Sequence, residues 1–343
     1  MDFKSLSYQE KERWNNFVLS SPFGHIFQTY EWGEVMKELG WEPLRFLVEE
    51  NGKILTAGQI LVRRKFGFSL LYIPRGPIFF DRESFEFFVG NLKEIMRRKR
   101  AIFCKINPAI RKSDEIEKWY VEAGFRKSNI RDMHICTYQI NLNQNLETIW
   151  KRFRGNVRTA IRKAEKSGVY VKCAHNEEHL KDFYTVYQTL QEKGKITVHN
   201  FNFFKKIWEK LEPKGQAKVF NAYLNGKVIA TEFILLYGEK AEQMWTANIR
   251  LKTDVGASQL IHWRIINWLK ENGFSVYDLG GIPPEKNELP GIHFYKSGFG
   301  GDFIEYLGEY EISGNPVFYY LWKKWGPLYL KRKGVWRQIA GRR

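Results

Sequence analysis

The chain has 343 residues, 43% of them hydrophobic and 16% aromatic, and this length and composition allow two domains with apolar cores. The net charge of +17 favours polyanionic partners, namely RNA, phosphorylated small molecules or an anionic membrane face. Three scattered cysteines exclude a disulfide framework or a Cys-rich metal site, and the charged N-terminal residues exclude a signal peptide. No apolar run is long enough to span a bilayer, so we expect a cytoplasmic protein.

In the first half of the chain, the spacing of apolar residues predicts helices from Tyr30 to Leu39 and from Phe85 to Arg100. The pair Asn51-Gly52 lies between apolar runs, which predicts a strand hairpin, and the same arrangement with a following Lys recurs at Asn225-Gly226. Each hairpin is followed by a further strand candidate. We interpret this repetition as a duplicated α/β unit, and two unrelated hairpins that share a common turn remain the alternative.

In the second half, the pattern predicts one long helix from Leu146 to Ser167 that ends at Gly168, a residue suited to a C-cap. Further helices are expected from His179 to Lys193, from Phe203 to Leu211 and from Val255 to Asn272. No low-complexity linker interrupts the chain, so we place the domain boundary in the polar residues 141–145.

The predicted long helix carries a strongly basic segment, KRFRGNVRTAIRKAEK at residues 151–166, with seven Lys or Arg and one Glu. Arg154, Arg158, Arg162 and Lys166 recur every four residues and therefore form one stripe. Like charges at this spacing weaken an isolated helix, which favours a phosphate-rich partner. A solvated basic face is the other interpretation.

The C-terminal residues 312–343 contain no acidic residue and eight basic ones, interleaved with Trp322, Trp325, Tyr329 and Trp336. We expect these aromatic side chains to pack on the first domain. For the charges two interpretations stay open, exposure to solvent and contact with an anionic membrane face or RNA.

Residues 252–257 open a predicted helix, and helix N-termini bind phosphates through free backbone N–H groups. The segment resembles the pyrophosphate loop of GNAT acyltransferases, Q/R-x-x-G-x-G/A, but has Lys252 at the first position and Val255 in place of the first Gly. A side chain at the latter position argues against acyl-CoA binding, and tight packing of helix on strand is the alternative role of Gly256. HExxH, GxSxG and Walker A motifs are absent and the histidines lack ligand spacing, so we expect no metal.

The most informative segment is YDLGGIPPEKNELPGIHFYKSGFGG, residues 277–301. A strand-like run stops at paired glycines, a loop follows, and Lys296 lies in that loop between aromatic residues and a second glycine cluster. Because glycine lets backbone approach a ligand closely, Lys296 is a candidate contact for an anion or a leaving group. A tight surface loop with a solvated lysine explains the same spacing.

Four blocks in order resemble the FemABX family, the tRNA-dependent peptidyltransferases that build the interpeptide bridges of peptidoglycan. They are HIFQTYEWGEVMKELGW from His25, LYIPRGPIF from Leu71, RGNVRTAIRKAEKSGVYV from Arg154, and YDLGGI followed by HFYKSGFGG. The resemblance implies two GNAT-like α/β (α+β) domains with mixed sheets flanked by helices and a cleft between them, namely residues 1–142 plus 311–343 and residues 143–310. We expect a monomer without the long helical arm that some members carry.

The resemblance implies that a free amine of a UDP- or lipid-linked muramyl peptide attacks the ester of an aminoacyl-tRNA. No metal, nucleotide or other cofactor is required, because the ester is already activated. Lys296 occupies the position of the family's functional lysine and would stabilise the oxyanion or the departing ribose oxygen, beside Tyr295 in the substrate site. Lys37 matches the residue that contacts precursor phosphates, Arg75 does likewise or pins the PRGP turn, and Trp245 lies near the precursor. The basic stripe would bind tRNA, in the cytoplasm or at the membrane periphery.

Two departures from the family pattern concern the site. Asn107 replaces the aspartate of a KIDP motif, and an amide does not take the proton from the attacking amine. The family's phosphate-binding arginine is not apparent, and Lys195 and His199 in KGKITVHN offer single contacts instead of a bidentate fork. Two rival functions remain open, a GNAT-type N-acyltransferase acting on another polysaccharide or peptide, and a basic RNA-binding protein.

Overall fold

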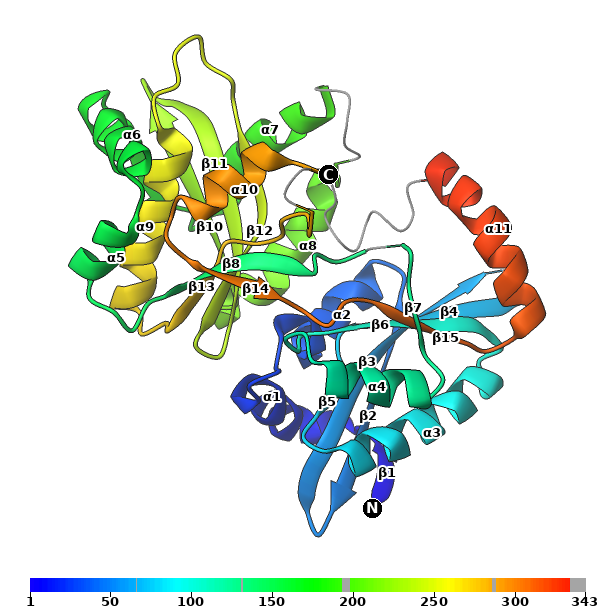
Figure 1. Ribbon diagram of the computed structural model, residues 1–343. Helices are drawn as coiled ribbons and strands as arrows, with labels where there is room; N and C mark the ends of the chain where they lie inside the picture. The colour runs from blue at the N-terminus through cyan, green and yellow to red at the C-terminus, as the bar shows by residue number, and fades with distance from the viewer. Residues whose placement is uncertain (66, 131, 193–197, 286–287, 334–343) are drawn as a thin grey trace. The chain divides into compact units, whose positions relative to one another are not determined.

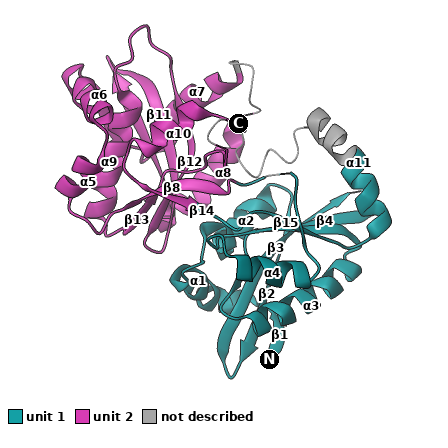
Figure 2. Cartoon of the chain, viewed as in Figure 1, with its two compact units in different colours: residues 1–133, 305–336 teal, residues 134–304, 337–343 magenta. Residues whose placement is uncertain are grey.

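The computed structural model describes residues 1–65, 67–130, 132–192, 198–285 and 288–333 (Figure 1). The chain divides into two compact units (Figure 2). The first contains residues 1–133 and the chain from Glu305 to the end of the described part, and the second contains residues 134–304. Each unit is a mixed sheet flanked by helices, as the α/β prediction requires.

The sheet of the first unit has the strand order β1-β2-β3-β4-β6-β15-β7, and β5 pairs with β3. β4 and β6 are parallel, whereas the neighbours on either side are antiparallel. β15 comes from the C-terminal part of the chain, so the chain returns to its first unit after completing the second. The strands are β1 (Asp2–Ser5), β2 (Glu42–Glu50), β3 (Lys53–Lys65), β4 (Phe68–Arg75), β5 (Ile78–Phe79), β6 (Ala101–Pro108), β7 (Arg126–Lys127) and β15 (Tyr310–Ser313).

Helices cover both faces of this sheet, because successive strand residues point to opposite faces. Val48 of β2 joins the core under α3 and α4, whereas the adjacent Leu47 joins Trp14 of α1 on the other face. Phe103 of β6 contacts α11. The helices are α1 (Lys11–Ser20), α2 (Tyr30–Glu38), α3 (Arg82–Arg98), α4 (Asp114–Glu122) and α11 (Pro316–Lys333).

The sheet of the second unit has the order β14-β8-β13-β12-β11-β10-β9, with a parallel pair at β12 and β13. α5, α6 and α9 contribute to the core on one face, and α7 and α8 pack on the other. The strands are β8 (Cys136–Asn141), β9 (Tyr170–Cys173), β10 (Ala217–Leu224), β11 (Lys227–Tyr237), β12 (Lys240–Asn248), β13 (Val276–Asp278) and β14 (Asp302–Glu305). The helices are α5 (Leu146–Arg152), α6 (Gly155–Lys166), α7 (Glu177–Glu192), α8 (Phe201–Leu211), α9 (Ala257–Glu271) and α10 (Pro290–Ser297).

Both predicted hairpins are confirmed, as β2–β3 and β10–β11. Asn51 and Asn225 have φ of 49° and 51°, and the glycines that follow have φ of 79° and 74°, which is the backbone of a type I′ turn. Each hairpin also has a register shift in its first strand, at Val48/Glu49 and at Ala222/Tyr223. In both hairpins the shift lies at the same distance before the Asn of the turn. This shared irregularity favours duplication over two unrelated hairpins.

The prediction of one helix from Leu146 to Ser167 was wrong, because the chain is extended at Phe153 and Arg154, with ψ of 139° and 151°. The backbone N–H of Arg154 donates to the carbonyl of Gly298 at 2.8 Å instead of continuing a helix, and the Phe153 side chain is buried in the core. The tertiary contact with the segment after α10 therefore divides the helix into α5 and α6.

A buried ion cluster ties the edge of the first sheet together. Lys105 of β6 is 2% exposed, and its Nζ lies 2.8 Å from Glu309 Oε2 and also donates to Asp132. Burial alone would lower the pKa of Lys105, but the two carboxylates outweigh burial and raise it. Glu309 also accepts the backbone N–H of Asp132 at 2.7 Å. In the sequence, Asp132 precedes the second unit and Glu309 follows it, so Lys105 links β6 to both of these segments.

We expect Lys105→Met to lower the free energy of unfolding by about 3–5 kcal/mol, because it leaves two buried carboxylates without their counter-charge. Urea unfolding followed by circular dichroism measures the change. Lys112→Met is the control, because it removes a lysine from an exposed pair with Glu305 at 2.8 Å and should change stability little. Equal stability of the two variants would contradict the prediction.

Candidate active site

Lys296 lies in the last turn of α10, so the expectation that it belongs to a loop was wrong. Pro290 occupies the first turn of α10, where its fixed φ suits a helix start and its missing N–H costs nothing. The Lys296 side chain is buried, with the residue 6% exposed, and Nζ donates to the carbonyl of Gly281 at 3.0 Å. The interpretation as a solvated surface lysine is therefore excluded.

The paired glycines after β13 bring that carbonyl into place. Gly280 has φ of 74°, and a Cβ at Gly281 would lie 2.4 Å from the Cβ of His134, so neither position accommodates a side chain. Asp278 fixes the turn by accepting the N–H of Gly280 at 2.8 Å. The glycine pair thus positions a backbone acceptor for Lys296 inside the unit.

Three buried polar side chains lie in the same core region as Lys296. Tyr277 of β13 donates its hydroxyl proton to Glu232 of β11 and lies 3.0 Å from Nδ1 of His262, which projects from α9. His262 Nδ1 is 3.6 Å from Glu232 Oε2, and all three residues are at most 2% exposed. Each comes from a different element, so the cluster depends on the correct packing of α9 against the sheet.

Burial sets the charge states of this cluster. It raises the pKa of Glu232 to about 7, against the opposing effects of the Tyr277 hydrogen bond and the Lys296 charge. Burial and the same lysine lower the pKa of His262 to about 3, so this imidazole is neutral near pH 7. The positive charge of Lys296 opposes the rise in the pKa of Glu232, so the two groups interact electrostatically inside the unit. Such a site can stabilise a negative charge that develops on a substrate.

The first member of the predicted basic stripe is directed at α10. Arg154 donates from Nη2 to Ser297 Oγ at 2.7 Å and to the carbonyl of Phe294, and its guanidinium lies 4.1 Å from the centre of the Phe294 ring. Tyr295 is half-buried and packs with ring centroids 5.8 Å from His262. Arg154 therefore supports the helix that carries Lys296.

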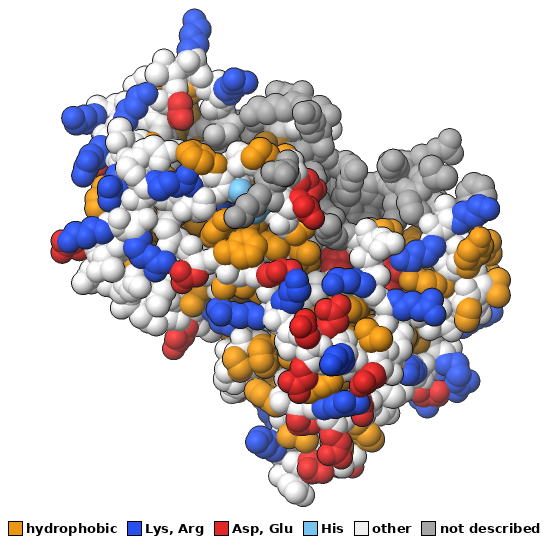
Figure 3. Space-filling model, viewed as in Figure 1, with side chains coloured by type: hydrophobic (Ala, Val, Ile, Leu, Met, Phe, Trp, Pro, Cys, Tyr) orange, Lys and Arg blue, Asp and Glu red, His pale blue; other side chains and the backbone are white. Residues whose placement is uncertain are grey.

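The other members of the stripe lie along α6. Arg158 is half-buried and donates to the carbonyl of Lys151 at 3.2 Å, Arg162 is exposed and lies over the Trp150 ring at 5.6 Å, and Lys166 is exposed. Figure 3 shows Lys and Arg side chains gathered over the region of α5 and α6. A basic surface is thus present over α5 and α6, and Arg154 at the junction of these helices supports α10, which carries Lys296.

His199 and Trp245 come together on the opposite face of the second sheet. Trp245 packs 5.3 Å from Phe233, which neighbours Glu232 on β11 and so points the other way. His199 stacks on Phe203 at 3.8 Å, and burial lowers the pKa of its imidazole to about 4. Neither His199 Nε2 nor Trp245 Nε1 has a hydrogen-bond partner among the described residues. Lys195, predicted beside them, lies outside the described part of the chain.

The predicted residues of the first unit have different surroundings. Arg75 is buried with φ of 54°, its guanidinium lies 4.7 Å from the Tyr306 ring, and its N–H donates to Asn107 Oδ1 at 2.7 Å. Asn107 Nδ2 donates to the hydroxyl of Tyr72 at 2.7 Å, so this amide holds the end of β4 in place. Lys37 is exposed on α2. Arg75 and Asn107 are therefore in contact, whereas Lys37 is not part of their hydrogen bonding.

The segment before α9 is poorly suited to pyrophosphate. The N–H of Gly256 donates to Asp254 Oδ1 at 2.9 Å, so a carboxylate occupies the donor that a phosphate would use. A Cβ at Gly256 would lie 2.2 Å from the carbonyl of Ala160, which shows that this glycine serves the close approach of α6. The adjoining pocket of about 680 Å³ includes Val255 and Lys252. Gly256 therefore serves tight packing, but its neighbour is the helix α6 and not a strand, so the expected packing of helix on strand was wrong.

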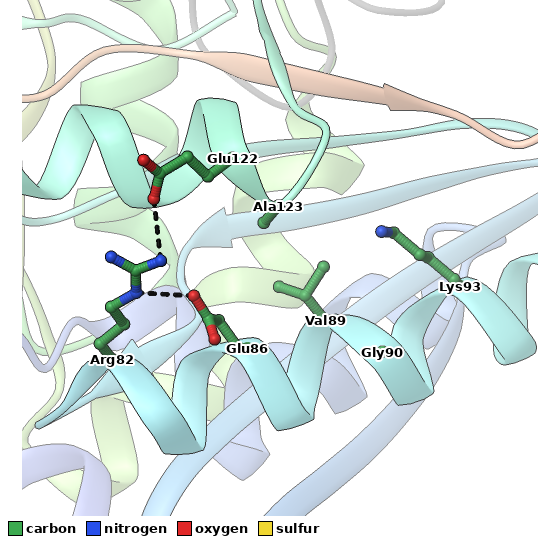
Figure 4. A pocket seen from close by; sticks show the side chains of 7 residues that line it. All are labelled: Arg82, Glu86, Val89, Gly90, Lys93, Glu122 and Ala123. Atoms are coloured by element: carbon green, nitrogen blue, oxygen red, sulfur yellow. Dashed lines mark hydrogen bonds and ion pairs between the residues drawn. The ribbon is translucent and has the colours of Figure 1, made fainter.

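A second pocket, of about 400 Å³, lies between α3 and α4 in the first unit (Figure 4). Arg82 spans it by pairing with Glu86 at 2.6 Å and with Glu122 at 2.8 Å. These charges largely neutralise one another, and none of the predicted site residues lines this pocket.

The fold is that of tandem GNAT-like proteins. The chain aligns with the tandem GNAT protein from the clavulanic acid biosynthesis pathway at a TM-score of 0.59 with 9% identity, covering 92% of this chain and 99% of that one. The crystal structure of FemX aligns at a TM-score of 0.83 with 19% identity, covering 94% and 99%. The profile of the FemAB family matches residues 9–233 and 228–324. The chain belongs to the FemAB family.

Two curated relatives span nearly the whole chain. The UDP-N-acetylmuramoylpentapeptide-lysine N(6)-alanyltransferase of Weissella viridescens is 26% identical and covers 91% of this chain and 96% of its own length. The Lipid II:glycine glycyltransferase of Staphylococcus epidermidis (strain ATCC 35984 / RP62A) is 22% identical and covers 95% and 97%. Among the described residues, no helix is long and apolar enough to cross a membrane.

The sequence analysis missed Glu232, His262 and Tyr277. Two signals were present, because Glu232 lies in the apolar run ATEFILL and His262 lies between apolar residues in LIHW. An ionisable residue at such a position is buried and so requires a partner. The identity of that partner follows only from the packing of α9 on β11.

We expect the stability of the protein to depend on pH through Glu232. Its pKa rises from 4.5 in the unfolded chain to about 7 in the folded one, so the folded state holds the proton more tightly. This stabilisation is complete below the unfolded value and is lost as the pH rises to the folded value, a loss of about 3 kcal/mol. Glu232→Gln should lack this loss. Urea unfolding of both proteins at about pH 5 and about pH 8 measures the difference, and parallel curves would contradict the assignment.

Proposed function

We propose that the protein is a tRNA-dependent aminoacyltransferase that moves an amino acid from an aminoacyl-tRNA to an amine of a muramyl peptide precursor. The observation that carries this proposal is the buried Lys296, whose ammonium group acts electrostatically on Glu232 and His262. Membership of the FemAB family supports the class of reaction, and the names of the two curated relatives support a muramyl peptide acceptor linked to UDP or to a lipid.

In the proposed reaction, the acceptor amine attacks the carbonyl carbon of the aminoacyl ester. A C–N bond forms, the C–O bond to the ribose breaks, and the electron pair of that bond stays on the ribose oxygen. The amine loses a proton and the ribose oxygen gains one, so the exchange balances without a cofactor. Lys296 stabilises the negative charge on the carbonyl oxygen or on the departing ribose oxygen.

Asn107 is not the base in this proposal. An amide lacks the basicity, and both of its polar atoms are engaged, Oδ1 with the N–H of Arg75 and Nδ2 with the hydroxyl of Tyr72. We infer that the proton of the amine passes to the departing ribose oxygen, directly or through water, since an ester of this kind needs little further activation. Asn107 and Arg75 then act by shaping the end of β4 for the acceptor.

In the second unit we propose that the face with His199 and Trp245 contributes to acceptor binding, with Lys195 as a sequence-based candidate beside it. In the first unit we propose a separate contribution from Lys37 and Arg75. His199 Nε2 and Trp245 Nε1 are buried polar atoms without partners among the described residues, which suits a site that a polar ligand completes. Tyr295 would border the reacting ester beside Lys296. The enzyme is proposed to be a cytoplasmic monomer with peripheral contact to the membrane.

The rival activity as an acyl-CoA-dependent N-acyltransferase is disfavoured, because Asp254 occupies the donor of Gly256 and Val255 replaces a glycine. A plain RNA-binding role does not require the buried cluster around Lys296. Neither rival has an observation in its favour beyond the fold or the net charge.

We expect Lys296→Met to lower the rate of transfer by about a thousandfold, because methionine fills the same space without the positive charge. Mass spectrometry of a muramyl pentapeptide incubated with mixed charged tRNAs detects the product. Lys227→Met, an exposed lysine of β11, is the control and should retain full activity. Circular dichroism verifies that both variants fold, and a fully active Lys296→Met would refute the role of this lysine.

We expect the exposed part of the stripe to contact tRNA phosphates. Arg162→Gln combined with Lys166→Gln should weaken tRNA binding and reduce the slope of log affinity against log salt by about one for each lost contact. Filter binding over a salt series measures both effects. The matched control is Lys181→Gln with Lys227→Gln, which removes the same charge from other exposed positions of the second unit. An unchanged slope in the stripe variant would place tRNA elsewhere.

A further inference from the structure

The helix α11 presents an apolar face to solvent. Val317 is 67% exposed, Tyr320 is 67% exposed and Leu321 is 43% exposed. Their spacing of three and four residues places them on one side of the helix. Isolated apolar residues on a surface are ordinary, but three on one helical face form a patch that needs an explanation.

The opposite side of α11 is anchored to the first unit. The rings of Tyr319 and Trp322 each lie 5.9 Å from the ring of Phe103, and the Tyr319 hydroxyl donates to Glu311 at 2.7 Å. Lys323 pairs with the same carboxylate at 3.0 Å. The expected packing of the tail aromatics on the first domain is confirmed for Trp322. Trp325, Tyr329 and Trp336 lie outside the part of the chain whose side chains are described. Val317, Tyr320 and Leu321 point away from the first unit.

The C-terminal segment of the sequence carries charge of one sign. Residues 312–343 include eight Lys or Arg and no acidic residue, and Lys324 is exposed next to Leu321. Figure 3 shows hydrophobic side chains beside Lys and Arg side chains over the described part of α11. A helix with an exposed apolar face and only basic charges has the composition of helices that lie in the interface of an anionic bilayer.

We propose that α11 is a membrane-docking helix for an anionic lipid surface. Val317, Tyr320 and Leu321 enter the boundary between headgroups and acyl chains, and Lys324 contacts lipid phosphates. Aliphatic side chains at 317 and 321 gain free energy from lipid but offer nothing to stack on RNA bases. Pairing with a second copy of the chain would bring two basic segments together, and the repulsion between their like charges opposes such pairing.

Docking has a consequence for the acceptor, and this consequence rests on the proposed function. An enzyme held at an anionic bilayer meets acceptors that are anchored in the same bilayer, so docking raises the rate with a lipid-linked muramyl peptide. It leaves the rate with a soluble UDP-linked peptide unchanged. The binding test below contains no acceptor, so the failure of the proposed transfer and the failure of docking are distinguishable.

The full-length protein is mixed with vesicles of phosphatidylglycerol and phosphatidylcholine, or of phosphatidylcholine alone, and binding is measured by co-sedimentation. We expect binding to the anionic vesicles only, and we expect Val317→Ser with Tyr320→Ser to weaken it by about tenfold or more. The matched control is Tyr8→Ser with Val121→Ser, since these residues are 72% and 57% exposed elsewhere on the first unit. The control should bind like the unaltered protein.

A second pair of variants tests the charges. Lys324→Glu should weaken binding to anionic vesicles, whereas Lys93→Glu, with the same change in net charge at an exposed position on α3, should not. The proposal fails if the unaltered protein ignores anionic vesicles or if the double serine variant binds them normally. It also fails if that variant instead loses tRNA binding, which would assign the patch to RNA, or loses a dimer in analytical ultracentrifugation, which would assign it to a second copy.

Discussion

The second unit depends on one constraint, the placement of a single lysine charge inside an apolar core. Removing an ammonium group from water costs several kcal/mol unless polar partners compensate for the lost hydration. Two of the groups that act on Lys296 are the Gly281 carbonyl, which accepts from Nζ at 3.0 Å, and the carboxylate of Glu232. That carboxylate is itself buried, and burial raises its pKa to about 7.

Neighbouring features of the unit follow from this constraint. The carbonyl of Gly281 reaches the lysine only because Gly280 and Gly281 carry no Cβ. Arg154 stabilises the last turn of α10. Its backbone N–H donates to the carbonyl of Gly298, and its side chain donates to Ser297 Oγ. These contacts interrupt the helix formed by α5 and α6. The break between α5 and α6 is therefore caused by contacts with residues some 140 positions further along the chain.

The elements that the sequence predicts correctly are those whose signal is local. The Asn-Gly turns, α2 and α9 follow from residues within one or two helical turns of each other, and the Lys296 segment is conspicuous by its glycines. The break at Arg154 is invisible locally, because the sequence there is a good helix former and only the carbonyl of Gly298 overrides it. The assignment of Lys296 to a loop failed for a related reason, since the glycines around α10 suggested irregular backbone and hid Pro290 as a helix start.

The cluster of Glu232, Tyr277 and His262 shows why a site is harder to predict from sequence than a helix or a turn. Each residue is separated from the others by a strand or helix, and their meeting is fixed by which face of β11 receives α9. Sequence periodicity places Glu232 opposite Phe233, and hence opposite Trp245, but does not say which face carries the chemistry. The structure separates a face with a charged, titratable cluster from a face with an aromatic cluster and two unpartnered polar atoms. The alternation of side chains along β11 therefore separates an ionisable cluster from an aromatic cluster, because Glu232 and Phe233 point to opposite faces of one sheet.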